Sequence, residues 1–515
     1  MRSTFHGLEV AKRSLFTQQV ALNTTGHNIA NANTPGYSRQ VVDMAASRPL
    51  EALGMWRSTA AGQIGMGVDA TAIRRVREKF LDDQFRNDFS KLGRWSVEQD
   101  TLEKIEAFFN EPSETGFTVV LERFWNAWAD LAKDPSSADG RRVLRESAMA
   151  LADAFNTISR QLTDLDQDLT TNLEVKTGQI NTLIQNIADL NRKIARLESL
   201  GDHANDLRDQ RDLFADELSK LINVTVEETA DGVYNVRLGN RVLVEGFTSE
   251  GIDVNELTSM FDQDLTGGEI YGMIRSKNVY IAGYLDSLNQ LANTLANGEV
   301  TVTLPAGTVL PEGVTLKVNG VETTFTGANR VLTSDLQVTV AGINGLHKLG
   351  YLMTDPPTTG GDFFVGTTAA DFKLNPDIQN NPSLIASSMR LTGIGNDDTV
   401  IRGNNTLALI MSELKNTKFT FTDAMGTETS IAAYYRSLVG QLGVQTNEAT
   451  RQTENMRVIV DQVDARRLSV SGVSLDEEMT NMIKFQHAYS AAARVMTTID
   501  EMLNKIINGM GVVGR

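Results

Sequence analysis

The segment Asn28–Gln40 reads NIANANTPGYSRQ, and it ends a stretch whose apolar residues recur at helical spacing. The apolar residues of this stretch lie seven positions apart: Leu8, Leu15, Leu22 and Ile29. Such a repeat predicts one apolar side of a helix over residues 5–33. Pro35 disfavours helix at the residue before it, and Pro35-Gly36 suits the central positions of a type II turn. The sequence therefore predicts a helix that ends near Thr34 in a tight turn.

A second amphipathic helix is predicted at the other end of the chain, where Val470–Leu503 reads VSGVSLDEEMTNMIKFQHAYSAAARVMTTIDEML. Ser474 suits the N-cap, Glu477 completes a capping box, and the acidic run Asp476–Glu478 favours a first helical turn over acid–base chemistry. The apolar side chains of this helix fit either an ordinary core or a seam for other helices: Leu475, Met479, Met482, Phe485, Tyr489, Ala493 and Met496. Because the two ends are built alike, we expect them to come together.

A long helix is predicted between these ends, because apolar residues recur in steps of four and three over Leu151–Leu197. Two successive steps of four within Leu165–Leu173 are a stutter, which leaves a helix continuous. A turn at Gly201–Asp206 precedes another helix that ends near Leu221. A matching helix over Ile431–Val463 predicts one elongated bundle.

The period changes to that of strands in a region of roughly residues 226–395. Six strands are predicted: Val224–Glu228, Val233–Leu238, Arg241–Val244, Val300–Leu304, Val314–Val318 and Val321–Phe325. Asp231-Gly232, Gly239-Asn240 and Asn319-Gly320 are typical hairpin turns, and one helix intervenes over Val279–Ala296. We expect residues 299–342 to form a dispensable outer module with short strands and self-contained turns, so that its ends lie close together.

The predicted fold class is mainly α with inserted β. It combines discontinuous terminal coiled-coil helices, an elongated helical bundle and one or two outward β-rich domains. We predict four parts for the 515 residues: a terminal helical assembly domain (1–45 with 470–515), a helical bundle (46–225 with 396–469), a β-hairpin module with a helix (226–298) and an inserted β-rich outer domain (299–395). The two terminal helices have no obvious local partner, so we expect them to be mobile in the free monomer.

Composition excludes several classes of partner and site. The net charge of −17 disfavours nucleic acid and anionic membranes, because both need clustered Lys and Arg. No window approaches 18 uncharged apolar residues, and the N-terminal stretch has no apolar core of a secretory signal. The chain has no cysteine, which excludes thiolate metal sites, Cys nucleophiles and disulfides.

The patterns that carry catalytic or metal chemistry are weak. The five histidines are expected to be solvated or capping, because no two share a metal-ligand spacing: His6, His27, His203, His347 and His487. Gly65-Met66-Gly67 with Ala70 matches a dinucleotide loop only by chance, since no apolar strand precedes it. Asp262 and Asp264 resemble the start of a calcium loop, but Met273 replaces its required Glu. We therefore predict no catalytic residue, no cofactor and no metal.

The quoted segments resemble those of the bacterial flagellar rod, hook and hook-associated axial proteins. NIANANTPGYSRQ is similar to their N-terminal signature, and Ser38-Arg39-Gln40 resembles the hook-associated members at the hook–filament junction. Val470–Leu503 is similar to the C-terminal segment of the same members. Strong resemblance covers about the first 90 and last 45 residues, whereas residues 299–342 resemble nothing that we can quote.

The resemblance implies a structural adaptor, not an enzyme, that joins hook to filament by coaxial packing of N- and C-terminal helices. It implies an extracellular place in the flagellum, reached by type III export without a cleavable signal peptide. The implied partners are copies of the chain in a ring or helix, hook protein, a second junction protein or filament-side subunit, and an export chaperone at the C-terminal helix. The implied assembly interface combines both ends: Leu8, Leu15, Leu22, Ile29, Pro35, Gly36, Tyr37, Leu475, Met479, Met482, Phe485, Tyr489 and Met496.

Two alternatives stay open. A hook or rod subunit of the same group would share the terminal segments, although the chain length and the Ser38-Arg39-Gln40 extension argue against it. A surface-exposed adhesin or enzyme would carry its site in the β-rich region, since one fold can host unrelated sites. Glycan binding or proteolysis by the purified monomer would favour this second alternative.

Overall fold

The computed structural model describes residues 5–48, 65–111, 113, 116–395, 398–421 and 428–509. Long helices dominate it and several β-sheets are inserted between them, so the predicted fold class is confirmed. The chain divides into two compact units. Unit 1 comprises Met1–Arg94, Glu174–Tyr271 and Thr453–Arg515, and unit 2 comprises Trp95–Leu173 and Gly272–Gln452. The predicted division into four parts stays a prediction.

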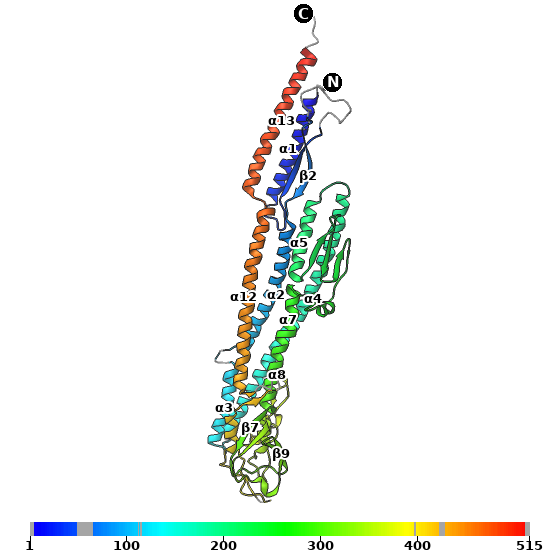
Figure 1. Cartoon of the computed structure of the whole chain (residues 1–515). Helices are drawn as coiled ribbons and strands as arrows, with labels where there is room; N and C mark the ends of the chain where they lie inside the picture. The colour runs from blue at the N-terminus through cyan, green and yellow to red at the C-terminus, as the bar shows by residue number, and fades with distance from the viewer. Residues whose placement is uncertain are drawn as a thin grey trace. The chain divides into compact units, whose positions relative to one another are not determined.

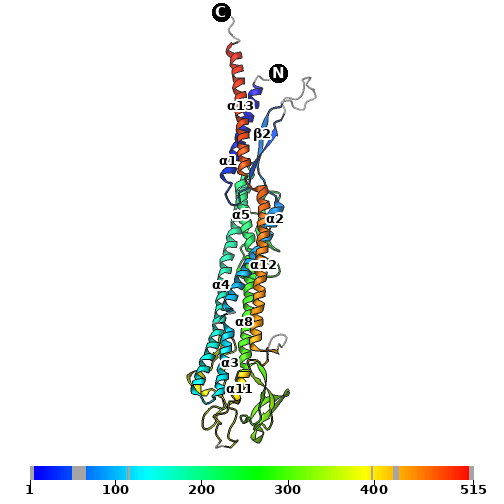
Figure 2. The ribbon, with the colours of Figure 1, turned by 90° about the vertical axis from the view of Figure 1, so that its left-hand side faces the viewer.

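In unit 1 the two terminal helices lie side by side (Figures 1 and 2). These are α1 (His6–Ala30) and α13 (Leu475–Gly509). They run antiparallel, because Gly7 near the start of α1 lies against Ile499 while Asn28 near its end contacts Glu478. The expectation that neither helix has a local partner is therefore wrong, since each is the partner of the other. Small residues such as Gly7 permit the close approach: a Cβ added there would lie 3.0 Å from Ile499 Cδ1.

The predicted turn after α1 is present. Gly36 has φ +77°, which a type II turn requires at its third position, and the Tyr37 N–H donates to the Thr34 carbonyl oxygen (3.2 Å). The chain then enters β1 (Gln40–Ala46), which pairs antiparallel with β2 (Val68–Arg75). Residues 65–67 lead into β2 rather than into a helix, so they lack the context of a dinucleotide loop.

The helices predicted between the chain ends are α4 (Ala138–Glu198), α5 (Asn205–Leu221) and α12 (Ile431–Ser471). Two further long helices are α2 (Lys79–Phe109) and α3 (Phe117–Lys133). Helix α4 is continuous through the predicted stutter, and the apolar residues of the Leu151–Ile194 repeat are buried or nearly so. Leu197, the last residue of that repeat, is 39% exposed, because it lies in the last turn of the helix. The repeat therefore packs along nearly its whole length.

Unit 1 also holds a four-stranded antiparallel sheet in the order β3-β4-β5-β6. Its strands are β3 (Thr225–Glu228), β4 (Tyr234–Leu238), β5 (Arg241–Glu245) and β6 (Thr248–Ser249), followed by α6 (Val254–Ser259). Gly232 (φ +73°) and Gly239 (φ +55°) occupy the two predicted hairpin turns. Both turns need positive φ, which glycine adopts without steric cost. The three predicted strands of this region are confirmed to within two residues at each end.

The predicted helix Val279–Ala296 starts eleven residues earlier than expected. It consists of α7 (Gly268–Arg275), a π-helical segment η1 (Ser276–Ile281) and α8 (Ala282–Asn297). Ile270 and Ile274, one helical turn apart, are both buried and extend its apolar side.

Unit 2 contains a six-stranded sheet in the order β14-β13-β7-β10-β8-β9. Its strands are β7 (Glu299–Leu304), β8 (Val314–Val318), β9 (Val321–Phe325), β10 (Leu336–Ala341), β13 (Phe419–Thr420) and β14 (Glu428–Thr429). Glu299 pairs with Ala341, so the ends of the 299–342 segment do lie close together. The segment also pairs outside itself, because β7 pairs with β13 through Val300 and Phe419, and its dispensability stays a prediction.

The remaining elements of unit 2 are short. They are the 3-10 helices η2 (Gly327–Arg330) and η3 (Pro382–Leu384), the helices α9 (Gly342–Leu349), α10 (Pro376–Asn380) and α11 (Thr406–Glu413), and the strand pair β11 (Phe364–Val365) and β12 (Lys373–Leu374). Among the described residues, no helix combines the length and the hydropathy needed to cross a bilayer.

Candidate assembly interface

The buried side chain of Asn28 joins the two terminal segments. Its amide nitrogen donates to the Gln40 carbonyl oxygen (2.9 Å) and to a Glu478 carboxylate oxygen (3.0 Å). Its amide oxygen accepts from the Gln40 N–H (3.0 Å) and from the Tyr37 hydroxyl (2.8 Å). All four hydrogen bonds that an Asn amide can make are therefore made. One side chain fixes the turn after α1 and holds the first turn of α13 against it.

Arg39 forms the second contact between these segments. Its guanidinium lies 2.8 Å from the carboxylate of Glu478 and 3.1 Å from that of Glu477. Its backbone N–H donates to the carbonyl oxygen of Ser471, at the end of α12 (2.8 Å). The predicted N-cap is present, since the Glu477 N–H lies 3.4 Å from Ser474 Oγ, but the carboxylate of Glu477 pairs with Arg39. Ser474 therefore caps α13, whereas the carboxylates of Glu477 and Glu478 bind the N-terminal segment.

The next residues of the N-terminal segment dock on α5. The Ser38 N–H donates to the carboxylate of Asp209 (2.9 Å). The Gln40 amide donates to the carboxylate of Asp206 (2.7 Å) and accepts from the amide of Asn205 (3.2 Å). Three polar residues in the first two turns of α5 thus fix where β1 begins.

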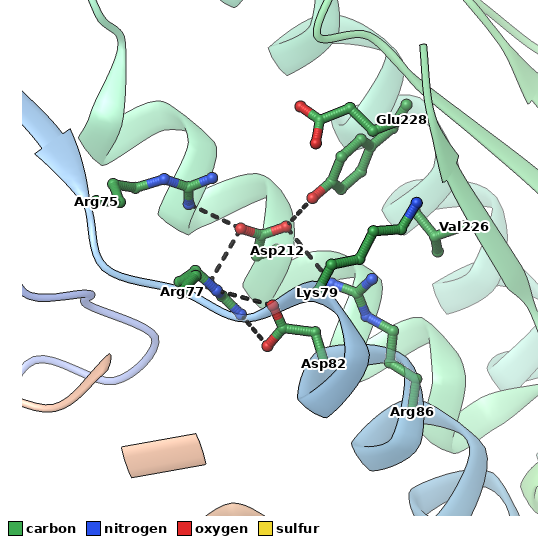
Figure 3. Close-up of a pocket in the computed structure, with 9 residues that line it drawn as sticks. Arg75, Arg77, Lys79, Asp82, Arg86, Asp212, Val226 and Glu228 are labelled. Atoms are coloured by element: carbon green, nitrogen blue, oxygen red, sulfur yellow. Dashed lines mark hydrogen bonds and ion pairs between the residues drawn. The ribbon is translucent and has the colours of Figure 1, made fainter. Parts of the chain in front are cut away.

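A buried carboxylate, Asp212, organises the side of α5 that faces β2 and α2 (Figure 3). It lies 2.7 Å from Arg75, 3.0 Å from Arg77 and 3.4 Å from Arg86, and it accepts a hydrogen bond from the Tyr234 hydroxyl. Burial raises the pKa of Asp212, but the three guanidinium groups lower it by more, so its net pKa lies well below the usual value.

The arginines around Asp212 each have a further carboxylate. Asp209 lies 2.7 Å from Arg75, Asp82 lies 2.7 Å from Arg77, and Asp216 lies 2.7 Å from Arg86 and 2.5 Å from Arg467. Burial lowers the pKa of Arg77 and of Arg86, but the neighbouring carboxylates raise both above the usual value. The cluster therefore favours the charged form of its arginines.

The cluster surrounds a cavity of about 150 Å³ that Lys79 and Glu228 also line. Its guanidinium groups already pair with carboxylates. These bonds link β2, α2, α5, α12 and β4 to one another. The cluster therefore holds together the elements next to the N-terminal segment. Such a buried network is costly to interrupt, since removing one member leaves a buried charge unpaired.

The predicted interface residues fall into two groups. The heptad residues of α1 and three side chains of α13 are half-buried: Leu8, Leu15, Leu22, Ile29, Met482, Phe485 and Met496. Tyr37 is half-buried by its bond to Asn28. The others are open to solvent: Pro35, Gly36, Leu475, Met479 and Tyr489, with Met479 57% exposed. An ordinary core does not describe α13, whose buried residues are Glu478 and Ala492, and the seam for other helices stays a prediction.

The histidine and calcium predictions have different outcomes. His347 is fully buried, where its Nδ1 lies 2.7 Å from the Gly361 carbonyl oxygen and its Nε2 accepts from the Ala386 N–H (3.0 Å). Burial lowers the pKa of His347 to about 4, so the expectation of a solvated or capping side chain is wrong there. The Asp262 carboxylate accepts from the Tyr271 hydroxyl (2.6 Å), a structural role. Within the described ranges, no cluster of three or more acidic or histidine side chains could hold a metal.

Sequence reasoning missed the polar residues that do the joining, above all Asn28, Arg39, Glu478 and Asp212. A weak signal was present in α5, where Asp209, Asp212 and Asp216 recur at steps of three and four and so share one side of the helix. An acidic stripe is usually a solvated side, and only the fold reveals that arginines cover this one.

Comparisons with known proteins show what the chain is similar to. The family model "Flagellar hook-associated protein FlgK helical domain" matches residues 102–302. "Flagella basal body rod protein" matches residues 8–37 and "Flagellar basal body rod FlgEFG protein C-terminal" matches residues 465–509. The flagellar hook-associated protein 1 of Bacillus subtilis is 34% identical over 535 aligned residues, which cover 100% of both chains.

The chain belongs to the flagellar hook-associated protein 1 family. The Escherichia coli member of this family is 25% identical over 97% of the chain and 98% of its own length. A solved structure, that of the flagellar hook junction protein FlgK from Burkholderia pseudomallei, shares the fold with a TM-score of 0.53 and 15% identity. It covers 76% of this chain and 100% of its own. As a hook-associated protein the chain is a structural component of the flagellum.

Proposed function

We propose that the chain is the structural subunit that joins the flagellar hook to the filament. The observation that carries this proposal is the buried Asn28–Glu478 hydrogen bond (3.0 Å). It joins two segments that match family models of flagellar rod proteins. These are residues 8–37 at the N-terminal end and residues 465–509 at the C-terminal end. The part of the subunit that would make the assembly contacts is thus the pair of terminal helices, α1 and α13.

The exposed side of this element supports an assembly role. Beyond the α1 contact, α13 leaves large apolar side chains open to solvent: Met479, Ile483, Val495, Met502, Ile506 and Ile507. These exposed apolar side chains support a surface on α13 that a partner covers. Neighbouring copies in a ring or helix, hook protein on one side and a second junction protein or filament subunit on the other, are the partners that we propose. An export chaperone would cover the same helix before assembly.

The proposed place of action is outside the cell, after export without a cleavable signal peptide. The proposed role is mechanical rather than enzymatic. The charged residues of the candidate interface support this, because their carboxylates and guanidinium groups are paired with one another.

Localisation tests the proposal. A tag inserted in the β8–β9 turn at Asn319-Gly320, which is far in sequence from both terminal helices, leaves the element intact. Immunogold electron microscopy of isolated flagella is expected to place the tag in a thin band between hook and filament. Label along the hook or the rod would assign the chain to those structures, and label on the cell surface away from flagella would contradict the proposal.

A further inference from the structure

Methionine is the only sulfur-containing side chain of this protein that an oxidant can attack. The chain has 17 methionines and no cysteine. Peroxides convert the methionine thioether to a sulfoxide, and here no thiol competes for the oxidant. Because the sulfur must meet the dissolved oxidant, the exposure of each methionine decides how readily it reacts.

The most exposed methionines lie on the C-terminal helix. Of the methionines that the structure describes, three are exposed: Met44 (38%), Met479 (57%) and Met502 (59%). The last two lie on α13, where Met482 and Met496 are half-buried. Three methionines outside α13 are buried: Met273, Met389 and Met411. A dissolved oxidant therefore reaches α13 before it reaches the core.

Met479 and Met502 each belong to an apolar strip on the open side of α13. Met479 lies one helical turn before Ile483, and Met502 lies one turn before Ile506, and both isoleucines are exposed. The exposure of all four shows that α1 does not cover them, although α1 is the partner of α13. A sulfoxide oxygen makes a methionine side chain polar, so it would interrupt each strip.

We infer that oxidation of Met479 and Met502 to methionine sulfoxide prevents α13 from entering the assembly. The thioether sulfur attacks hydrogen peroxide, the S–O bond forms as the O–O bond breaks, and the peroxide is reduced to water while the sulfur is oxidised. A sulfoxide buried in an apolar contact lacks a hydrogen-bond donor, which disfavours the contact. The inference rests on the proposed function, which supplies the contact of α13; it adds a reversible modification that regulates this contact.

Peptide mass spectrometry tests the modification itself. The purified free chain and isolated flagella are treated with dilute hydrogen peroxide, and the uptake of oxygen is followed for each methionine. In the free chain Met479 and Met502 are expected to react well before Met389, and in flagella both are expected to be protected. Equal rates for Met479 and Met389 in the free chain would overturn the inference, and so would equal reaction of Met479 in the free chain and in flagella.

Binding to isolated hooks tests the consequence. The quantity measured for each chain is the ratio of binding at hook ends after peroxide treatment to binding before it, at a dose that oxidises Met479 and Met502. For the unaltered chain this ratio is expected to fall about tenfold, the effect of one unpartnered polar group in the contact. For a chain with both Met479→Leu and Met502→Leu the ratio should stay near one, because leucine is not oxidised. Met44→Leu is the matched control, since Met44 is exposed but lies on β1, and this chain should stay as sensitive as the unaltered one.

Enzymatic reduction gives a reading that needs no substitution. Methionine sulfoxide reductases A and B together reduce both epimers of the sulfoxide, so they are expected to restore binding of the oxidised chain. Undiminished binding of the oxidised chain, or no recovery after reduction, would overturn the inference and leave the proposed function intact. Failure of the untreated chain to bind hooks would overturn the proposed function, and the inference with it.

Discussion

The amide nitrogen of Asn28 donates to the carboxylate of Glu478 over 3.0 Å, and 450 residues of sequence separate the two. Both side chains are almost fully buried, and Arg39 completes the contact from the same N-terminal segment. The bond sets the position of α13 along α1, because a shift of either helix would leave an amide and a carboxylate buried without partners. Polar contacts of this kind fix register more than they add stability.

Removal of the Glu478 carboxylate should loosen the terminal helices. Glu478→Ala leaves Asn28 and Arg39 without their shared acceptor, which should cost about 3 kcal/mol and, in isolated flagella, raise amide exchange in Asn28–Gln40 roughly a hundredfold. Glu477→Ala is the matched control, because the Glu477 side chain is 63% exposed and its pair with Arg39 is worth little. Equal protection in the two variants would show that the buried bond is not needed.

The Asp212 cluster predicts a loss of stability in acid. Burial raises the pKa of Asp212 but the three arginines lower it further, so its folded pKa lies below the unfolded value of about 4. A depressed folded pKa gives stability that is fully present above about pH 4 and is lost as the pH falls through the folded value. Asp212→Asn should lower the free energy of unfolding by about 3 kcal/mol at pH 7 and by less near pH 3.

Denaturant unfolding of the Asp212→Asn chain and the unaltered chain between pH 7 and pH 3 measures this. The difference in the free energy of unfolding between the two chains reports on Asp212. The neighbouring Asp209 is present in both chains, and burial raises its pKa, so its contribution to stability changes with pH in the opposite direction. A difference that stays constant over this range would contradict the predicted role.

The stutter of α4 provides a test of buried packing. Leu165→Asp places an unpaired carboxylate at a site that is 6% exposed, which should destabilise unit 2 by about 3 kcal/mol or more. Leu197→Asp changes the same residue type in the same repeat at an exposed site, and it should alter the melting temperature little. If the two variants melt alike, the stutter does not lie in a packed seam.

The inserted sheet should tolerate a small deletion better than a large one. Replacing residues 306–334 with a short Gly-Ser turn keeps β7 paired with β10 through Leu304 and Leu336 and removes the edge hairpin β8–β9. Replacing residues 299–342 also removes the strand that β13 pairs with, which exposes Phe419. Thermal unfolding is expected to show a larger loss for the larger deletion. A larger loss for the smaller deletion would refute this account of the sheet.

The elements themselves could be predicted from local patterns. The Leu151–Ile194 repeat gave α4, Pro35-Gly36 gave the turn after α1, and Asn319-Gly320 gave the hairpin of β8 and β9. In each case the signal lies within a few residues, because periodicity and turn geometry are local.

The partners of these elements could not be predicted in the same way. No pattern near Val300 reveals that it pairs with Phe419, and no pattern near Asn28 reveals Glu478. Asp212 reads as a solvated acid in sequence, yet three arginines from β2, α2 and the link between them surround it. Pairings between distant segments depend on the tertiary fold. The local sequence around either partner contains no pattern that predicts them.

In the proposed function, the terminal helices α1 and α13 become fully buried only in the assembly. The buried residues of α1 are small or polar, and α13 buries only Glu478 and Ala492. Helices with so little apolar burial are marginal in water. We therefore keep the expectation of mobile ends, although α1 and α13 are partners.

Amide hydrogen exchange of the full chain, compared between the free monomer and isolated flagella, tests this most directly. The account predicts weak protection of α1 and α13 in the monomer and strong protection in flagella, with the amides of the buried α4 repeat strongly protected in both. Strong and equal protection of α1 and α13 in a verified monomer would contradict it.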